Sequence, residues 1–175
     1  MLRLQSAIVV LVPEAEQLVG PFREKHDPSA RAGMPSHITL LYPFKPPCEI
    51  SGVVFDTLNQ CFTRFEAFDF SLTTIRRFSP EVLYLAPEPD ESFRRLTLAV
   101  WNCYPETPPY GGRCSSITPH LTVAQLADEQ QLEQIAVEFA RASERGLPIH
   151  ATASEIALMD TLEGSWQVRA TFTLR

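Results

Sequence analysis

The sequence has few of the features that mark several common classes of protein. Its four cysteines, among 175 residues, form no Cys-x-x-Cys pair and no dense framework, which favours free thiols in a reducing compartment over a disulfide-stapled fold. No apolar run is long enough to span a membrane, and no small-residue cleavage site follows the apolar N-terminal stretch. We therefore expect a cytoplasmic protein that does not insert into a membrane.

Positive charge is also scarce, because 15 lysines and arginines stand against 21 acidic residues and give a net charge of −6 at pH 7. A protein that holds an extended nucleic acid needs clustered basic residues to neutralise the phosphates. The balance argues against extended nucleic-acid binding, so a nucleotide ligand would be small or held at one end. Apolar residues make up 45% of the chain, which is ordinary for one soluble domain with a substantial core.

Strand-like and helix-like periodicity alternate along the chain. β-branched runs and period-two alternation predict strands over 6–12, 37–40, 68–73, 82–86, 120–123, 149–162 and 166–174. Helical spacing of apolar residues predicts helices over 14–25, 51–65, 90–104 and 128–145. We expect Gly20-Pro21 to kink or divide the first helix, and Ser51, Asp90 and Asp128 to cap the other three. The proline-rich segment 105–118 predicts a long loop.

The order strand, helix, strand, helix, strand occurs twice, over approximately 1–79 and 80–175, and the second unit has an extra strand appended. We interpret this as an internal duplication within one domain, 1–175, whose two units pack about a pseudo-twofold axis. The predicted fold is α+β and bilobal, with two mostly antiparallel sheets around a central cleft. We expect the chain to be a monomer.

One short pattern occurs at equivalent places in the two units. His37 and Thr39 alternate with apolar residues in the first unit, and His120 and Thr122 do so in the second. In a β-strand, alternate side chains share a face, so each copy presents an imidazole and a hydroxyl side by side. A single such motif is usually a packed or hydrogen-bonded strand, but the pair favours catalysis. We expect both motifs to face one cleft, with the threonine hydroxyls turned the same way.

These side-chain types suit the cleavage of a phosphodiester. In-line attack on phosphorus needs one proton removed from the entering oxygen and one delivered to the leaving oxygen. Two imidazoles, with an ordinary pKa of roughly 6.5, can hold opposite protonation states near neutral pH. The threonine hydroxyls can donate hydrogen bonds to the non-bridging oxygens, so no metal or other cofactor is required. We expect turnover that survives chelation and a bell-shaped pH profile set by the two imidazoles.

The paired motifs resemble those of the two-histidine (2H) phosphoesterase superfamily, which includes bacterial 2′-5′ RNA ligases and cyclic nucleotide phosphodiesterases. Residues 37–40 and 120–123 both match the family's His-x-Thr/Ser-hydrophobic pattern, and 37–44 resembles the first motif of the 2′-5′ RNA ligase-like branch. The resemblance implies a metal-independent phosphodiesterase that acts on a 2′,3′-cyclic phosphate of a nucleotide or RNA end. It also implies that His120 is the general base and His37 the general acid. It leaves open the substrate and whether hydrolysis or ligation is the relevant direction.

Other residues are candidates for substrate binding. Tyr42 and Phe44 can stack on a base, although packed aromatics are commoner, and Arg113 can meet a phosphate from the loop before the second motif. Arg76 and Arg77 can do so from a strand end, although a solvated arginine is the simpler interpretation of all three.

Two other classes of function stay open at this point. The histidines can bind zinc, but such a site normally needs three protein ligands and no Asp, Glu or Cys lies at helpful spacing. Alternatively, the chain is a non-catalytic module that binds a nucleotide or RNA end on the same fold.

Overall fold

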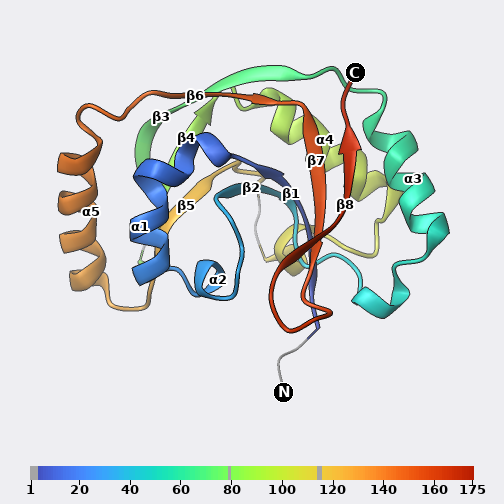
Figure 1. Ribbon diagram of the computed structural model, residues 1–175, viewed down its shortest axis with the longest axis horizontal. Helices are drawn as coiled ribbons and strands as arrows, with labels where there is room; N and C mark the ends of the chain where they lie inside the picture. Colours follow the sequence, from blue (N-terminus) through green and yellow to red (C-terminus); the bar gives the residue numbers. More distant parts are fainter. Residues whose placement is uncertain (1–3, 79, 114–115) are drawn as a thin grey trace.

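The computed structural model describes residues 4–78, 80–113 and 116–175. The described α-helices are α1 (Glu16–His26), α2 (Pro28–Arg31), α3 (Gly52–Phe62), α4 (Glu91–Cys103) and α5 (Glu129–Ser143). The described strands are β1 (Ser6–Leu11), β2 (His37–Leu41), β3 (Phe68–Phe78), β4 (Val82–Glu88), β5 (Leu121–Gln125), β6 (Ile149–Ala153), β7 (Glu155–Asp160) and β8 (Gln167–Thr173). The α+β class is thereby confirmed (Figure 1).

The strands form one antiparallel sheet in the order β6-β3-β4-β5-β2-β1-β7-β8. The expectation of two separate sheets is therefore wrong. One half of the sheet is β6-β3-β4-β5 and the other is β2-β1-β7-β8. The two halves meet where β2 pairs with β5, through Ile38 and Leu121. Without that pairing each motif strand would be a sheet edge with unpaired backbone groups, and joining the halves removes both edges.

The sheet curls into a half-barrel. Strand β6 is one edge, and β7 is the second strand from the other edge, yet only Ser154 separates them in the chain. The two ends of the sheet must therefore come close together, and Figure 1 shows β6 crossing over the top of the molecule into β7.

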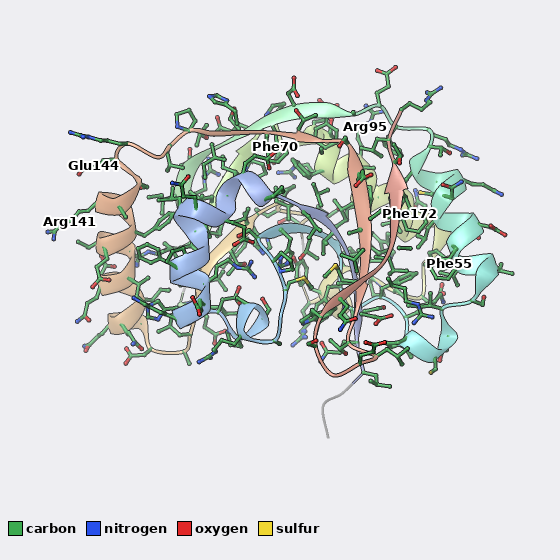
Figure 2. The ribbon with its side chains drawn as sticks, viewed as in Figure 1. Phe55, Phe70, Arg95, Arg141, Glu144 and Phe172 are labelled. Carbon is green, nitrogen blue, oxygen red and sulfur yellow. The ribbon has the colours of Figure 1, made fainter. Side chains whose placement is uncertain are left out.

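Helices cover one face of the sheet in two pairs. Helix α1 packs against α5 and β5, whereas α3 packs against α4, and α4 lies against β2 (Figure 1). Helix α1 follows β1 but covers β5, and α4 follows β4 but covers β2. Each of these helices therefore covers the motif strand in the other half of the sheet. The main core lies between this face and the helices, with Phe70 and Phe172 pointing into it, whereas Arg141 of α5 and Glu144, just after its last residue, point outward (Figure 2). Within the described residues, no helix is long and apolar enough to cross a membrane.

The three expected N-cap residues lie at the starts of their helices, but only one of them makes a capping hydrogen bond. Asp128 caps α5 as expected, because its carboxylate accepts a hydrogen bond of 3.1 Å from the backbone N–H of Gln131. Ser51 and Asp90 hold the N-cap positions of α3 and α4, but neither side chain makes a capping hydrogen bond, and Asp90 binds Arg94 instead. Helix α1 is not divided, since it continues through Pro21.

Candidate active site

The pairing of β2 with β5 brings the two motifs side by side. Ile38 and Leu121 are opposite each other and fully buried against the helices. Because side chains alternate along a strand, the motif histidines and threonines all point to the opposite face, away from the main core. Extending the antiparallel register by one residue sets His37 across from Thr122, and Thr39 across from His120. All four side chains are partly exposed, as a reacting group must be.

The two imidazoles are held by the same local contact. The Nδ1 atom of His37 lies 2.7 Å from the carbonyl oxygen of Pro35, and that of His120 lies 2.8 Å from the carbonyl oxygen of Thr118. A carbonyl oxygen only accepts hydrogen bonds, so Nδ1 carries the proton in both rings. In the neutral ring, Nε2 is then the basic atom, and each histidine offers the same nitrogen for proton transfer.

The surroundings of both rings favour the neutral form. Burial is the largest cause that lowers the pKa of His37 to about 4; the positive charges of Arg23 and His120 act in the same direction, while the bond to Pro35 and the charge of Asp27 oppose it. Burial also lowers the pKa of His120, against the effect of its backbone hydrogen bond. The charge of His120 lowers the pKa of His37, which agrees with the position of both rings on one face of the sheet.

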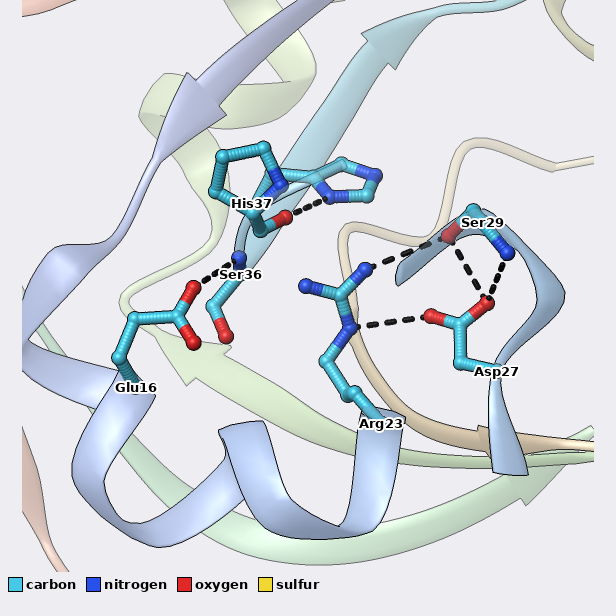
Figure 3. Close-up of polar contacts among 7 residues, drawn as sticks. Glu16, Arg23, Asp27, Ser29, Ser36 and His37 are labelled. Atoms are coloured by element: carbon cyan, nitrogen blue, oxygen red, sulfur yellow. Dashed lines mark hydrogen bonds and ion pairs between the residues drawn. The ribbon is translucent and has the colours of Figure 1, made fainter. Parts of the chain in front are cut away.

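A buried ion pair lies behind His37, and sequence reasoning did not single it out. Arg23 of α1 is 2% exposed; its Nε donates to a carboxylate oxygen of Asp27 at 3.0 Å and its Nη2 donates to Ser29 Oγ at 3.2 Å. Figure 3 shows the Arg23 guanidinium with Asp27 and Ser29 on one side and the start of β2 on the other. The i,i+4 spacing of Arg23 and Asp27, just before Pro28, was the available signal.

The start of β2 is also tied to α1. The backbone N–H of Ser36 donates to Glu16 Oε1 at 2.5 Å (Figure 3). The Ser36 carbonyl accepts from Val12 N–H at 2.9 Å. Among the described residues, no partner was found for the fully buried Ser36 hydroxyl. These contacts fix the backbone that leads directly into His37.

Aromatic rings surround His120, and sequence reasoning also missed them. Phe78 and Tyr84 meet the imidazole edge to face, with ring centroids 4.9 and 5.4 Å away, and Tyr110 stacks on it at 6.1 Å. Phe78 and Tyr84 stack on each other at 4.3 Å. Only the register of β3 with β4 and of β4 with β5 brings Phe78 and Tyr84 beside the second motif, so no local pattern reveals them.

A pocket of about 180 Å³ lies beside the motifs, between β2, α4 and the loop before β5. Thr39, Trp101, Tyr110 and Thr118 are among its lining residues. The described parts of the expected loop, 105–113 and 116–118, thus lie next to the candidate site, and residues 114–115 lie outside the described residues. A short 3-10 segment (Pro109–Gly112), with a left-handed kink at Tyr110 and Gly111, interrupts the loop.

The weaker sequence candidates are dispersed. Tyr42 packs against Trp166 at 6.4 Å and donates a hydrogen bond to Gln5. Phe44 is 6% exposed and packs edge to face with Tyr104 in the main core, which leaves no free face for stacking on a base. Arg113 is exposed, and its Nε donates to the Tyr110 carbonyl at 3.3 Å. In the described part of the chain, no group of three or more His, Cys, Asp or Glu side chains could hold a metal ion.

The chain belongs to the 2′-5′ RNA ligase superfamily, because the model of that family matches residues 11–165. Among curated proteins, a Staphylococcus saprophyticus protein that carries the name putative phosphoesterase is 26% identical over 160 residues, which are 89% of this chain and 90% of the relative.

Solved structures agree with the fold. The structure of Escherichia coli LigT complexed with 3′-AMP matches with a TM-score of 0.61 and 16% identity over 97% of both chains. The complex of the same protein with ATP gives 0.59 and 18% over 97% of both chains. A protein of Thermus thermophilus, TT0787, gives 0.58 and 20% over 98% of both chains. At these identities the likeness shows a LigT-like fold, and the two E. coli structures are described as nucleotide complexes of that protein.

Proposed function

We propose that this protein is a metal-independent phosphodiesterase that hydrolyses the 2′,3′-cyclic phosphate of a nucleotide or an RNA end. The observation that carries the proposal is the shared geometry of the two motifs. Both imidazoles lie on one face, both are fixed through Nδ1 to a backbone carbonyl, and both therefore offer Nε2 to a substrate. Membership of the 2′-5′ RNA ligase superfamily supports the same class of reaction.

The proposed reaction balances without a further reactant. One neutral imidazole takes a proton from water as the water oxygen bonds to phosphorus. The bond from phosphorus to the 3′ oxygen breaks, and the other imidazole, in its protonated form, gives its proton to that oxygen. A 2′-phosphate remains. The threonine hydroxyls donate hydrogen bonds to the non-bridging oxygens and so stabilise the negative charge on these oxygens in the transition state.

We assign the general base to His120 and the general acid to His37. A leaving group that departs readily as an anion needs no proton, so an aryl phosphodiester bypasses the acid but not the base. His37→Ala should therefore retain much of its activity on an aryl ester while losing it on a cyclic nucleotide, and His120→Ala should lose both. The opposite pattern would reverse the roles, and an equal loss on both substrates would reject a division of labour.

The substrate is identified by a screen in EDTA. Purified protein is offered 2′,3′-cyclic nucleotides, RNA with a cyclic-phosphate end and ADP-ribose cyclic phosphate, and phosphorus NMR assigns the position of the product phosphate. The proposal predicts a 2′-phosphate product from a nucleotide or RNA substrate. Binding of these compounds without turnover would instead support a non-catalytic nucleotide-binding module.

A further inference from the structure

The face of the sheet that carries the motif histidines and threonines continues beyond them onto β4 and β3. Thr122 of β5 pairs with Tyr84 of β4, and Tyr84 pairs with Arg76 of β3. Residues that pair across neighbouring strands share a face, so Arg76 lies on the same face as the motif histidines. Two strand spacings of about 4.8 Å put the Arg76 Cα roughly 10 Å from that of Thr122.

The side chain of Arg76 is available for a ligand. It is exposed, and within the described residues no carboxylate pairs with it. Its neighbour in the sequence, Arg77, points to the opposite face, where it pairs with Glu133 of α5 at 2.6 Å. The chain thus holds two adjacent arginines of which one is engaged by a helix and the other faces the candidate site.

The surface between Arg76 and the motifs is aromatic. Phe78 lies two residues further along β3 on the same face, 36% exposed, and stacks on Tyr84 while its edge meets His120. An exposed ring beside an available guanidinium suits a nucleotide, because a base can stack on the ring while the cation binds a phosphate. A net charge of −6 gives the protein no general attraction for anions, so a cation placed here acts locally.

We propose that Arg76, beside Phe78, forms a subsite for a second phosphate, that of the nucleotide next to the cyclic phosphate. The substrate class is then the terminus of an RNA chain, rather than a free cyclic mononucleotide. This inference rests on the proposed function, because it places the reacting phosphate at the two motifs.

The test compares Arg76→Gln with Arg77→Gln, a matched loss of one charge from the neighbouring residue. The value of kcat/KM is measured for a nucleoside 2′,3′-cyclic phosphate and for a dinucleotide that ends in a 2′,3′-cyclic phosphate. The preference is the ratio of kcat/KM for the dinucleotide to kcat/KM for the mononucleotide. We expect this ratio to be about tenfold lower for the R76Q protein than for the wild type, because a charge-assisted contact is lost. We expect the R77Q protein to keep the wild-type preference. The R76Q change should also reduce the salt dependence of kcat/KM for the dinucleotide, by about 0.7 in the slope of log kcat/KM against log salt.

A binding measurement keeps the two proposals separable. The dissociation constant of a dinucleotide with a 2′-phosphate end is measured for the wild type, R76Q and R77Q proteins by calorimetry, after circular dichroism and melting have shown that all are folded. Weaker binding by the R76Q protein, with unchanged binding by the R77Q protein, supports the subsite. A lack of turnover of both cyclic phosphates would reject the phosphodiesterase and would leave this support for the subsite in place. Equal effects of R76Q and R77Q on affinity and on preference would overturn the subsite and leave the phosphodiesterase standing.

Discussion

At the scale of single residues, His37 shows how the fold sets proton affinity. Its side chain is only partly exposed, and burial, together with the nearby Arg23, lowers its pKa to about 4. This environment keeps the ring neutral in the free protein across the physiological range. His37 therefore fills its assigned role of general acid only in the substrate complex, where the negative charge of the bound phosphate raises the pKa of the ring.

This shift makes stability depend on pH. The unfolded chain protonates the ring near pH 6.5 and the folded chain only near pH 4, so between these values the unfolded state binds more protons. The free energy of unfolding therefore falls as pH falls through this window, by on the order of 1–2 kcal/mol from this residue at pH 5. His37→Asn should remove that share, so urea denaturation at pH 7 and pH 5 should show a smaller difference for the variant than for the wild type. An unchanged difference would show that His37 titrates normally.

The Arg23–Asp27 pair permits a matched comparison with the Arg94–Asp90 pair, which has the same i,i+4 separation but is exposed. Arg23→Met leaves a carboxylate buried and unpaired, so we expect a loss of about 3–5 kcal/mol in the free energy of unfolding. Arg94→Met should cost less than about 1 kcal/mol. Urea denaturation of both variants decides this, and losses of equal size would contradict the structural distinction.

At the scale of secondary-structure elements, the N-caps offer a similar contrast. Asp128 accepts a hydrogen bond at the start of α5, whereas Ser51 makes none at the start of α3. Asp128→Ala should therefore lower the free energy of unfolding by about 1 kcal/mol, and Ser51→Ala should lower it by clearly less. Thermal melts of the two variants measure this, and an equal or larger effect at Ser51 would count against the capping difference.

Element positions could be predicted from sequence because they depend on local periodicity. The strand over 6–12 and the alternating segment over 166–174 correspond to β1 and β8, with no end shifted by more than one residue. The union of the two halves into one sheet could not be predicted, because it depends on one long-range pairing, Ile38 with Leu121. An apolar residue at either position is equally compatible with a separate sheet.

The same division holds for the candidate site. The histidine and threonine of each motif lie two residues apart and carry a recognisable pattern, so they could be named in advance. Arg76 and Arg77 were both named as phosphate candidates, but the sequence could not distinguish between them. Strand register, which sequence periodicity does not provide, is what places Arg76 and Tyr84 on this face. Arg23 lies in an amphipathic helix, where an arginine is ordinarily solvated, and only the packed structure shows that it is buried.

At the scale of the whole molecule, the sheet order is symmetrical about the β2–β5 pair, with β1 and β4 flanking it and β7 and β3 beyond them. The duplication inferred from 1–79 and 80–175 remains a proposal, and this symmetry supports it. The consequence for the proposed function is that each unit contributes one motif imidazole, so neither unit alone holds both of the proposed proton-transfer groups.

The central claim is that these two imidazoles carry the chemistry together. The most direct test is the pH profile of kcat/KM for hydrolysis of a nucleoside 2′,3′-cyclic phosphate in excess EDTA. Because the pKa of both histidines is lowered in the free protein, the account predicts a bell whose two limbs both lie at or below about pH 6.5. Replacing either histidine with alanine should lower the maximum by roughly 10²–10⁴-fold and remove the bell. Activity that disappears in EDTA and returns with zinc or magnesium, or a bell that survives loss of either histidine, would contradict the account.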